Sequence, residues 1–158
     1  MPKIYLRAIE PDDAKITYKW RNDRAVTDPL GGNSYFVSEA KEMAWIQKVI
    51  QNDSSSVRLG ICSIDNNTLI GFVNLIRINY QNQNAEFSIM IGDGDYRGKG
   101  FGFEATIMCL MYAFDELNMN RIYLYVRQDN PIAIALYTKI GFVEEGVCEA
   151  RQEVKSEK

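Results

Sequence analysis

The chain has 158 residues, of which 46% are hydrophobic and 25% are charged. This size and composition predict one globular domain over residues 1–158 with a core of its own, and leave no room for a second domain. The formal net charge of −3 argues against a general nucleic-acid binder and is compatible with a cationic or amine substrate.

Histidine is absent from the sequence, which excludes Ser-His-Asp and Cys-His catalysis and metal sites built on imidazole. Cys62, Cys109 and Cys148 lie far apart, so we expect a reducing compartment and neither a disulfide framework nor a metal cage. The N-terminus has no signal-peptide pattern, and no apolar run reaches membrane-spanning length. We therefore expect a cytoplasmic protein that uses no metal and binds neither a membrane nor nucleic acid.

The first third of the chain predicts a strand followed by two helices. Ile4–Ala8 has strand composition, and Pro11–Asp13 is typical of the first turn of a helix, which we expect to reach about Asn22. Residues 28–33, with a proline and two glycines, predict a loop. Ser38 is a candidate N-cap for the second helix, which we expect to end in residues 52–56.

Three strands are predicted next, at residues 57–64, 68–78 and 85–91. The connections between them, residues 65–67 and 80–84, are too short for a crossover. The three strands therefore form antiparallel hairpins.

The last third alternates helix and strand. From Phe103 apolar residues recur at helical spacing, and Arg121–Val126 is rich in β-branched and aromatic residues. Because a helical crossover joins residues 85–91 to this strand, the two strands should be parallel. Asn130-Pro131 opens a final helix and Gly141 ends it. The order of elements predicts an α+β fold.

The segment Asp95–Gly102 is the most informative for function. Gly98, Gly100 and Gly102 stand between a predicted strand and a predicted helix, where the first N–H groups of the helix have no intrahelical acceptor. Arg97 and Lys99 add cationic side chains that turn geometry does not explain. Together with the helix dipole, these features predict a phosphate-binding loop.

Two known phosphate loops were compared with this segment. The nucleoside-triphosphate loop needs a hydroxyl residue after Gly-Lys, but Gly98-Lys99 is followed by Gly100, so that interpretation is excluded. Residues 100–105 do fit the looser dinucleotide pattern G-x-G-x-x-A. That pattern belongs to a doubly wound parallel sheet, whereas the strands before it here are predicted to be antiparallel, so a dinucleotide-binding protein stays a minor alternative.

The chain resembles the Gcn5-related N-acetyltransferase (GNAT) superfamily over nearly its whole length. Two motifs carry the resemblance, in the same order as in the family. They are Arg97-x-x-Gly100-x-Gly102, which matches the pyrophosphate signature Q/R-x-x-G-x-G/A, and Asn130-x-x-Ala133-Ile134-x-Leu136-Tyr137-x-Lys139-x-Gly141-Phe142. The opening, with Leu6-Arg7-Ala8, Glu10-Pro11-Asp12-Asp13 and Trp20-Arg21-Asn22-Asp23, is similar to the ribosomal-protein N-terminal and spermidine acetyltransferases.

The resemblance implies a mixed, mostly antiparallel central sheet with helices on both faces, a three-layer α/β/α sandwich. Acetyl-CoA, as co-substrate, would enter where the parallel pair of strands splays. The pantetheine arm would bond to the backbone of Ile89 and Ile91, because unpaired backbone groups are costly to bury. The pyrophosphate would accept hydrogen bonds from the N–H groups of Gly98–Gly102. The remaining predicted cofactor-binding residues are Arg97, Gly98, Lys99, Gly100, Phe101, Gly102 and Asn130.

The implied reaction is direct transfer of an acetyl group to a primary amine in a ternary complex. Tyr137 matches the family's general acid, and Glu86 is a candidate general base, acting directly or through water. For Glu86 an ordinary solvent-facing strand position is an equal alternative. Trp20, Arg21, Tyr35 and Trp45 are weaker candidates for an acceptor pocket, because aromatic residues at helical spacing usually belong to a core. The acceptor class stays open among protein N-termini, polyamines and small amines.

The end of the chain departs from the family pattern. The family continues with two strands after Phe142, whereas residues 143–158 end in a charged run and leave room for one strand, about Phe142–Cys148. The family's last strand is therefore missing, which would expose a sheet edge and leads us to expect a homodimer or a partly open site. The same departure keeps open a non-catalytic acetyl-CoA- or CoA-binding module.

Overall fold

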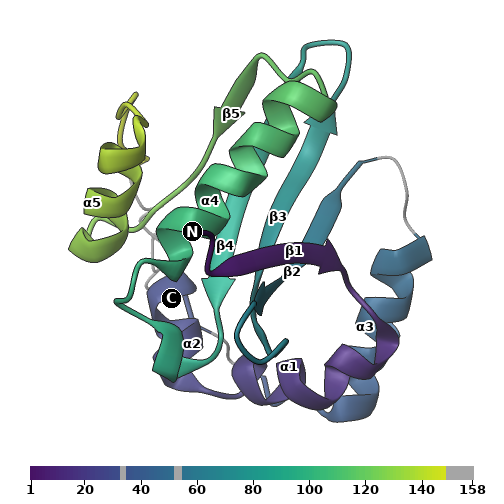
Figure 1. Ribbon diagram of the computed structural model, residues 1–158. Helices are drawn as coiled ribbons and strands as arrows, with labels where there is room; N and C mark the ends of the chain where they lie inside the picture. Colours follow the sequence, from purple (N-terminus) through teal and green to yellow (C-terminus); the bar gives the residue numbers. More distant parts are fainter. Residues whose placement is uncertain (33–34, 52–54, 149–158) are drawn as a thin grey trace, which may run out of the picture.

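The computed structural model describes residues 1–32, 35–51 and 55–148 (Figure 1). The strands are β1 (Ile4–Ala8), β2 (Val57–Ser63), β3 (Leu69–Asn79), β4 (Asn84–Ile91) and β5 (Arg121–Tyr123). The helices are α1 (Ala14–Arg21), α2 (Arg24–Thr27), α3 (Glu39–Gln51), α4 (Phe101–Met111) and α5 (Pro131–Ile140). Single turns occur at η1 (Pro11–Asp13), η2 (Asp28–Leu30) and η3 (Gly94–Tyr96), and the π-helical turn η4 (Tyr112–Glu116) extends α4.

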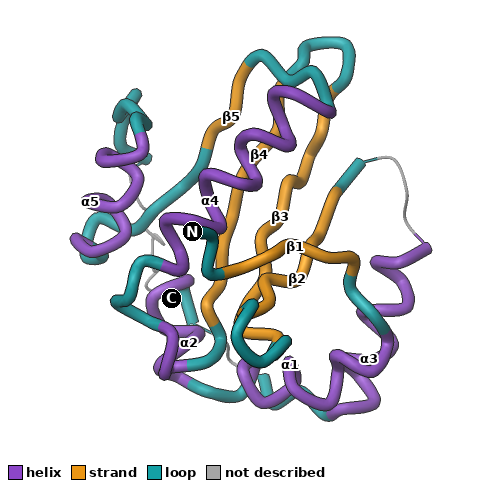
Figure 2. Tube along the Cα trace, in the orientation of Figure 1, coloured by secondary structure: helices purple, strands orange, loops and turns teal. Residues whose placement is uncertain are grey.

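The five strands form one sheet in the order β1-β2-β3-β4-β5 (Figure 2). Neighbouring strands from β1 to β4 are antiparallel, and β4 and β5 are parallel. Both predictions are confirmed: the short connections made hairpins, and the crossover through α4 made the parallel pair. The antiparallel strands also rule out the doubly wound sheet that the dinucleotide alternative requires.

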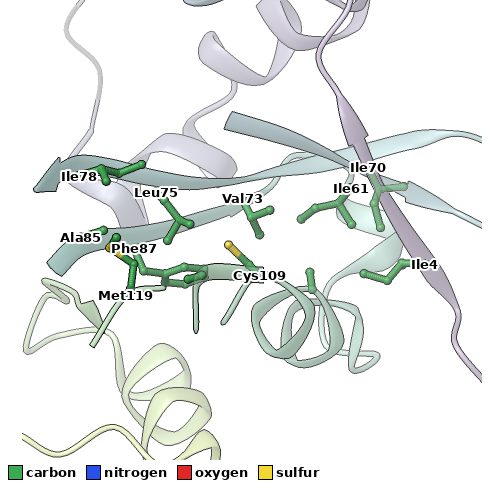
Figure 3. Packing of buried hydrophobic residues seen from close by; sticks show 12 residues of the cluster. Ile4, Ile61, Ile70, Val73, Leu75, Ile78, Ala85, Phe87, Cys109 and Met119 are labelled. Carbon is green, nitrogen blue, oxygen red and sulfur yellow. The ribbon is translucent and has the colours of Figure 1, made fainter. Parts of the chain in front are cut away.

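Each face of the sheet carries its own core, because side chains alternate along a strand. On one face Ile61, Val73 and Phe87 pack with Cys109 of α4 (Figure 3). On the other face the neighbouring residues Cys62, Phe72 and Met90 pack with Trp20 of α1 and Ile46 of α3. The sandwich therefore has helices on both faces, as predicted.

Trp20 belongs to this second core rather than to a pocket. It is 7% exposed, its ring centroid lies 5.7 Å from that of Phe72, and its ring occupies the space that a Cβ atom at Gly92 would need. Gly92 follows β4 directly and precedes the glycine-rich loop. Trp20 thereby packs against the end of β4, from which the glycine-rich loop starts.

The N-terminal helices agree with their sequence signals at most positions. Ser38 caps α3 by accepting a hydrogen bond from the Lys41 N–H at 3.1 Å. The predicted loop at residues 28–33 is wrong for its first three residues, which form η2, and α2 was not predicted at all. In α2, Asp23 accepts a hydrogen bond from the Ala25 N–H at 2.9 Å, a capping signal that is too short-ranged to identify a single helical turn. Asn33 and most of the predicted end of α3, residues 52–54, lie outside the described residues.

The predictions at the C-terminal end of the sheet need two corrections. The strand predicted as Arg121–Val126 ends at Tyr123, because the chain then turns away from β4 towards α5 (Figure 1). Phe142–Cys148 is not a strand, so the expectation of one more strand there is wrong. With β5 only three residues long, this segment has little edge to pair with, and Glu145 instead forms a bidentate ion pair with Arg121. The charged run after Cys148 lies outside the described residues.

Helix length and composition also bear on membrane association. Among the residues that the structure describes, no helix has the length and apolar character needed to cross a bilayer.

Candidate active site

The parallel strands β4 and β5 separate after a short contact. They pair only at Asn84–Arg121, Ala85–Ile122 and Glu86–Tyr123, so the last five residues of β4 have no partner strand on this side within the described chain. The predicted splay is therefore present. It exposes one backbone edge of β4 between Phe87 and Ile91.

The direction of the backbone groups shows which residues of β4 face the opening. The Gly92 N–H donates to Ile70 O of β3 at 2.9 Å, and successive residues of a strand turn their backbone groups to opposite sides. Ile89 and Ile91, an odd number of residues from Gly92, therefore turn theirs towards the opening. These are the two residues that were predicted to bond a pantetheine arm.

The glycine-rich segment makes a left-handed entry into α4. Gly98 has φ 70° and Gly100 has φ 86°, values that favour glycine. The Arg97 N–H donates to Gly94 O and the Glu104 N–H to Gly100 O. The first N–H groups of α4, from Phe101 to Phe103, have no intrahelical acceptor and lie, after the turn at Gly98–Gly100, at the positive end of the α4 dipole.

Gly102 lies close to both β4 and α5. A Cβ atom placed on Gly102 would lie 4.0 Å from side-chain carbons of Ile89, Ile91 and Leu136, which is ordinary van der Waals contact. The donors of the loop, the free edge of β4 and α5 meet at this point.

The cations near the loop include both predicted residues. Arg97 is tied to the strand end, because its Nε donates to Ile91 O and its Nη2 to Gly92 O, each at 3.1 Å, and it keeps its charge beside the loop. Lys99 is exposed, as predicted for an anion-binding side chain. Two further lysines lie nearby: Lys3 Nζ is 5.7 Å from the Phe101 ring centroid, and Lys139 Nζ is 5.1 Å from that of Phe103.

The helix α5 has the ends that its sequence predicts. Asn130 accepts a hydrogen bond from the Ala133 N–H at 3.2 Å, and Gly141 ends the helix at φ 119°. The Phe142 N–H donates to Tyr137 O at 3.0 Å, and the two rings pack edge to face, 5.7 Å apart. The structure places Asn130 as an N-cap, which fixes the start of the helix that carries Tyr137.

Tyr137 lies over β4 on the α4 side of the sheet. Its ring centroid is 6.3 Å from that of Phe87, and it packs against the first core. Burial raises the pKa of Tyr137 to about 12, because an apolar environment disfavours the phenolate. The phenol therefore keeps its proton throughout the neutral range and is suited to donate it.

Glu86 lies on the opposite face of the same strand. It is 9% exposed, so the alternative of a solvent-facing strand residue is wrong. Its Oε1 accepts a hydrogen bond from Arg77 Nη1 at 3.3 Å. Arg77 interrupts the β3–β4 pairing at a bulge and has φ 50°, a left-handed conformation that no sequence signal indicated.

Another aromatic candidate, Trp45, lies close to two guanidinium groups. Those of Arg21 and Arg58 lie 4.7 Å and 5.3 Å from its ring centroid. Arg21 also donates to the buried carboxylate of Glu42, which accepts a second hydrogen bond from Thr17 at 2.9 Å. This cluster ties α1 and α3 to β2. Tyr35 is exposed.

The described part of the chain contains no group of three or more Cys, Asp and Glu side chains arranged to hold a metal ion. The chemistry that this site offers thus consists of backbone donors, a buried phenol and a carboxylate, arranged around the end of a split between two strands.

Comparison with known proteins agrees with this arrangement. Residues 3–143 match the family model of the acetyltransferase (GNAT) domain. Spermidine N(1)-acetyltransferase of Vibrio cholerae is 36% identical over 144 residues, which cover 91% of this chain and 81% of that protein. Uncharacterized N-acetyltransferase p20 of Bacillus licheniformis is 27% identical over 154 residues, which cover 97% of this chain and 86% of that protein.

A solved structure gives the same result in three dimensions. The spermidine N-acetyltransferase of V. cholerae in complex with CoA and spermine superposes with a TM-score of 0.83 at 35% identity, covering 91% of this chain and 83% of that one. The family model and the similarity in sequence and fold leave the non-catalytic module without support. The chain belongs to the GNAT acetyltransferase family and is an acetyl-CoA-dependent N-acetyltransferase.

Proposed function

We propose that this enzyme acetylates a primary amine of a polyamine, with spermidine as the first substrate to test, by direct transfer from acetyl-CoA. One observation carries the proposal: β4 and β5 part directly after Glu86, with Tyr137 over one face of β4 and Glu86 on the other. The named activity of the V. cholerae relative supports spermidine as the acceptor.

The co-substrate would lie along the free edge of β4. Its pyrophosphate would accept hydrogen bonds from the N–H groups of Gly98, Gly100, Phe101 and Gly102, with Lys99 beside them. The amides of its pantetheine arm would pair with the backbone of Ile89 and Ile91. Since Arg97 already bonds to the carbonyl of Ile91, we assign Arg97 a role in shaping the loop and leave the N–H of Ile91 for the ligand.

The transfer requires three proton movements. Glu86 would accept a proton from the acceptor ammonium, directly or through water, so that the free amine can attack the thioester carbonyl. As the new C–N bond forms and the C–S bond breaks, Tyr137 would give its proton to the departing thiolate, and the second proton that the attacking nitrogen loses would return to the Tyr137 oxygen, directly or through water. The raised pKa of Tyr137 keeps that proton available at neutral pH.

The test is acetylation of an amine panel, followed by mass spectrometry and thiol release. We expect spermidine and spermine to be acetylated with a higher kcat/KM than butylamine or a peptide N-terminus. Glu86→Gln should lower kcat/KM for spermidine and leave the Kd for acetyl-CoA within about twofold. Equal rates for all four amines would contradict the polyamine assignment, and acetylation of none would contradict the proposed function.

We also propose self-association through the outer side of β5. This strand forms the edge of the described sheet, and next to it lies an apolar pocket of about 230 Å³. The pocket is lined by Leu110, Phe114, Ile122, Ile140, Gly141 and Phe142. One structure of the V. cholerae relative is described as dodecameric. Light scattering at high concentration tests this proposal, and a monomeric mass would contradict it.

A further inference from the structure

We infer that Tyr123 and Tyr125 form, together with Glu86, a binding wall for the ammonium groups of a polycationic acceptor, with the reacting group at Glu86 and a second one over the rings. The inference rests on the proposed function and deepens it, because it assigns the residues that would distinguish an acceptor with several positive charges from a simple amine. We call these three residues the ammonium wall.

The three side chains share one face of the sheet. Glu86 lies opposite Tyr123 in the parallel pair, and directly opposed residues project to the same face. Tyr125 follows two residues later, with its ring centroid 6.1 Å from that of Tyr123 and the rings 85° apart. The neighbours Ile122 and Leu124 pack on the other face, against the core around α4.

The wall starts where the strands part. The pairing of Glu86 with Tyr123 is the last one between β4 and β5, so Tyr125 lies on the chain as it leaves the sheet. Tyr125 is 69% exposed, which is high for an aromatic side chain, and its ring makes an edge-to-face contact with Tyr123. An amine that approaches the split from the Glu86 face would pass these rings.

The wall already binds cations of the protein itself. The Arg121 guanidinium lies 5.8 Å from the Tyr123 ring centroid, and Arg77 donates to Glu86. Arg121 is neutralised by two contacts to Glu145, whereas Arg77 has one contact of 3.3 Å and a side chain that is 71% exposed. A substrate ammonium can therefore replace Arg77 at Glu86, because the exposed arginine can move into solvent while the ammonium becomes the new partner of the carboxylate.

Besides the Glu86 carboxylate, the aromatic faces of the two tyrosines can bind an ammonium group. A ring of tyrosine attracts a cation through its quadrupole, with a strength that depends on the π face rather than on the hydroxyl. The wall thus presents a carboxylate and two rings to one ligand. A neutral or singly charged acceptor has only its reacting amine to place there and gains less from it.

The test compares a polyamine with a monoamine in the same enzyme. We expect Tyr125→Leu to lower the ratio of kcat/KM for spermidine to that for butylamine by about three- to fivefold, the size of an exposed cation–π contact. Tyr125→Phe should keep the ratio near that of the wild type. Tyr80→Leu, which removes a tyrosine that is 54% exposed at the β3–β4 turn, serves as the matched control and should also keep it.

Binding gives the same comparison without turnover. Calorimetry of spermine with the CoA-saturated protein should show the Kd rising by a similar factor in Tyr125→Leu and not in Tyr125→Phe. If wild-type protein binds spermine without acetylating it, the proposed function is contradicted, but the ammonium wall as a binding site is still supported. An unchanged ratio and an unchanged spermine Kd in Tyr125→Leu, or no spermine binding at all, would overturn the wall.

Discussion

Arg97 Nε donates a hydrogen bond to the backbone carbonyl oxygen of Ile91 at 3.1 Å, which ties the glycine-rich loop to the last residue of β4. A second bond from the same guanidinium reaches Gly92 O, also at 3.1 Å. The arginine of the phosphate signature therefore acts on the shape of the loop. It donates to two carbonyl groups at the strand end that no strand of the described chain pairs with.

This arrangement separates two variants that the sequence alone would group together. We expect Arg97→Ala to lower the free energy of unfolding by about 2 kcal/mol, because two carbonyl groups lose a charged donor. Lys99→Ala should change it by less than about 0.5 kcal/mol, since Lys99 is exposed. Both should weaken acetyl-CoA binding. Denaturant unfolding and calorimetry measure the two effects, and equal stability of the two variants would contradict the structural role.

Arg97 and Lys99 show which contacts a sequence can predict and which it cannot. The hairpins of β2, β3 and β4 follow from short connections, and the ends of α5 follow from Asn130 and Gly141, because these signals are local. The hydrogen bonds of Arg97 depend on how the loop folds back on the strand. Lys3 contacts the Lys99 carbonyl across 96 residues of sequence, a proximity that only the packing of β1 beside α4 creates.

The features that the sequence predicted wrongly or left open have physical reasons as well. The composition of residues 124–126 favours a strand, but a strand also needs a partner, and the chain leaves β4 after Tyr123. Glu86 was equally compatible with solvent and with a site until its burial was known. For Arg77, the left-handed conformation in the bulge has no signature, because glycine or asparagine would be the expected residue there.

Tyr137→Phe tests the proposed proton donor. Removal of the hydroxyl should lower kcat by about 100-fold, the lower end of what general acid catalysis contributes. The ring contacts to Phe87 and Phe142 do not use the hydroxyl, so the Kd for acetyl-CoA should stay within about twofold of the wild type. Stopped-flow thiol release and calorimetry provide the two numbers. An unchanged kcat would remove Tyr137 from the mechanism.

Ionisation of Tyr137 gives a separate prediction about stability. Its pKa rises from 10.0 to about 12 on folding, so the folded state holds this proton more tightly than the unfolded state. The resulting stability is fully present below pH 10 and is lost between pH 10 and about 12. Over this window the wild type should lose about 2 to 3 kcal/mol more than Tyr137→Phe. Parallel pH dependence of the two proteins would contradict the burial of the phenol.

The thiols should differ sharply in reactivity. Cys62 and Cys109 are buried, and burial raises the pKa of Cys109 to about 12, whereas Cys148 is exposed. Because the thiolate is the reactive form, an aromatic disulfide reagent should label Cys148 quickly and leave the other two until the protein unfolds. Cys148→Ser should abolish the fast phase. A fast phase of more than one thiol per chain would show that one of the two cores opens readily.

Gly92→Ala tests how tightly the end of β4 is held. A Cβ atom at this position would lie 1.9 Å from the Trp20 ring, which is 7% exposed and packs against Phe72. Overpacking of this kind should cost about 2 to 3 kcal/mol. The matched control is Gly146→Ala, where no atom lies within 4 Å of the new Cβ and φ is not positive.

The functional consequence of Gly92→Ala follows from its position. Gly92 receives the Arg97 hydrogen bond and leads into the loop, so a shift of the strand end should move the N–H groups that face the phosphate. We expect the Kd for acetyl-CoA to rise in Gly92→Ala at temperatures where the variant is still folded, and to stay unchanged in Gly146→Ala. Circular dichroism confirms the folded state, and calorimetry gives the Kd. Wild-type affinity in a destabilised but folded Gly92→Ala would show that Trp20 supports the fold without positioning the loop.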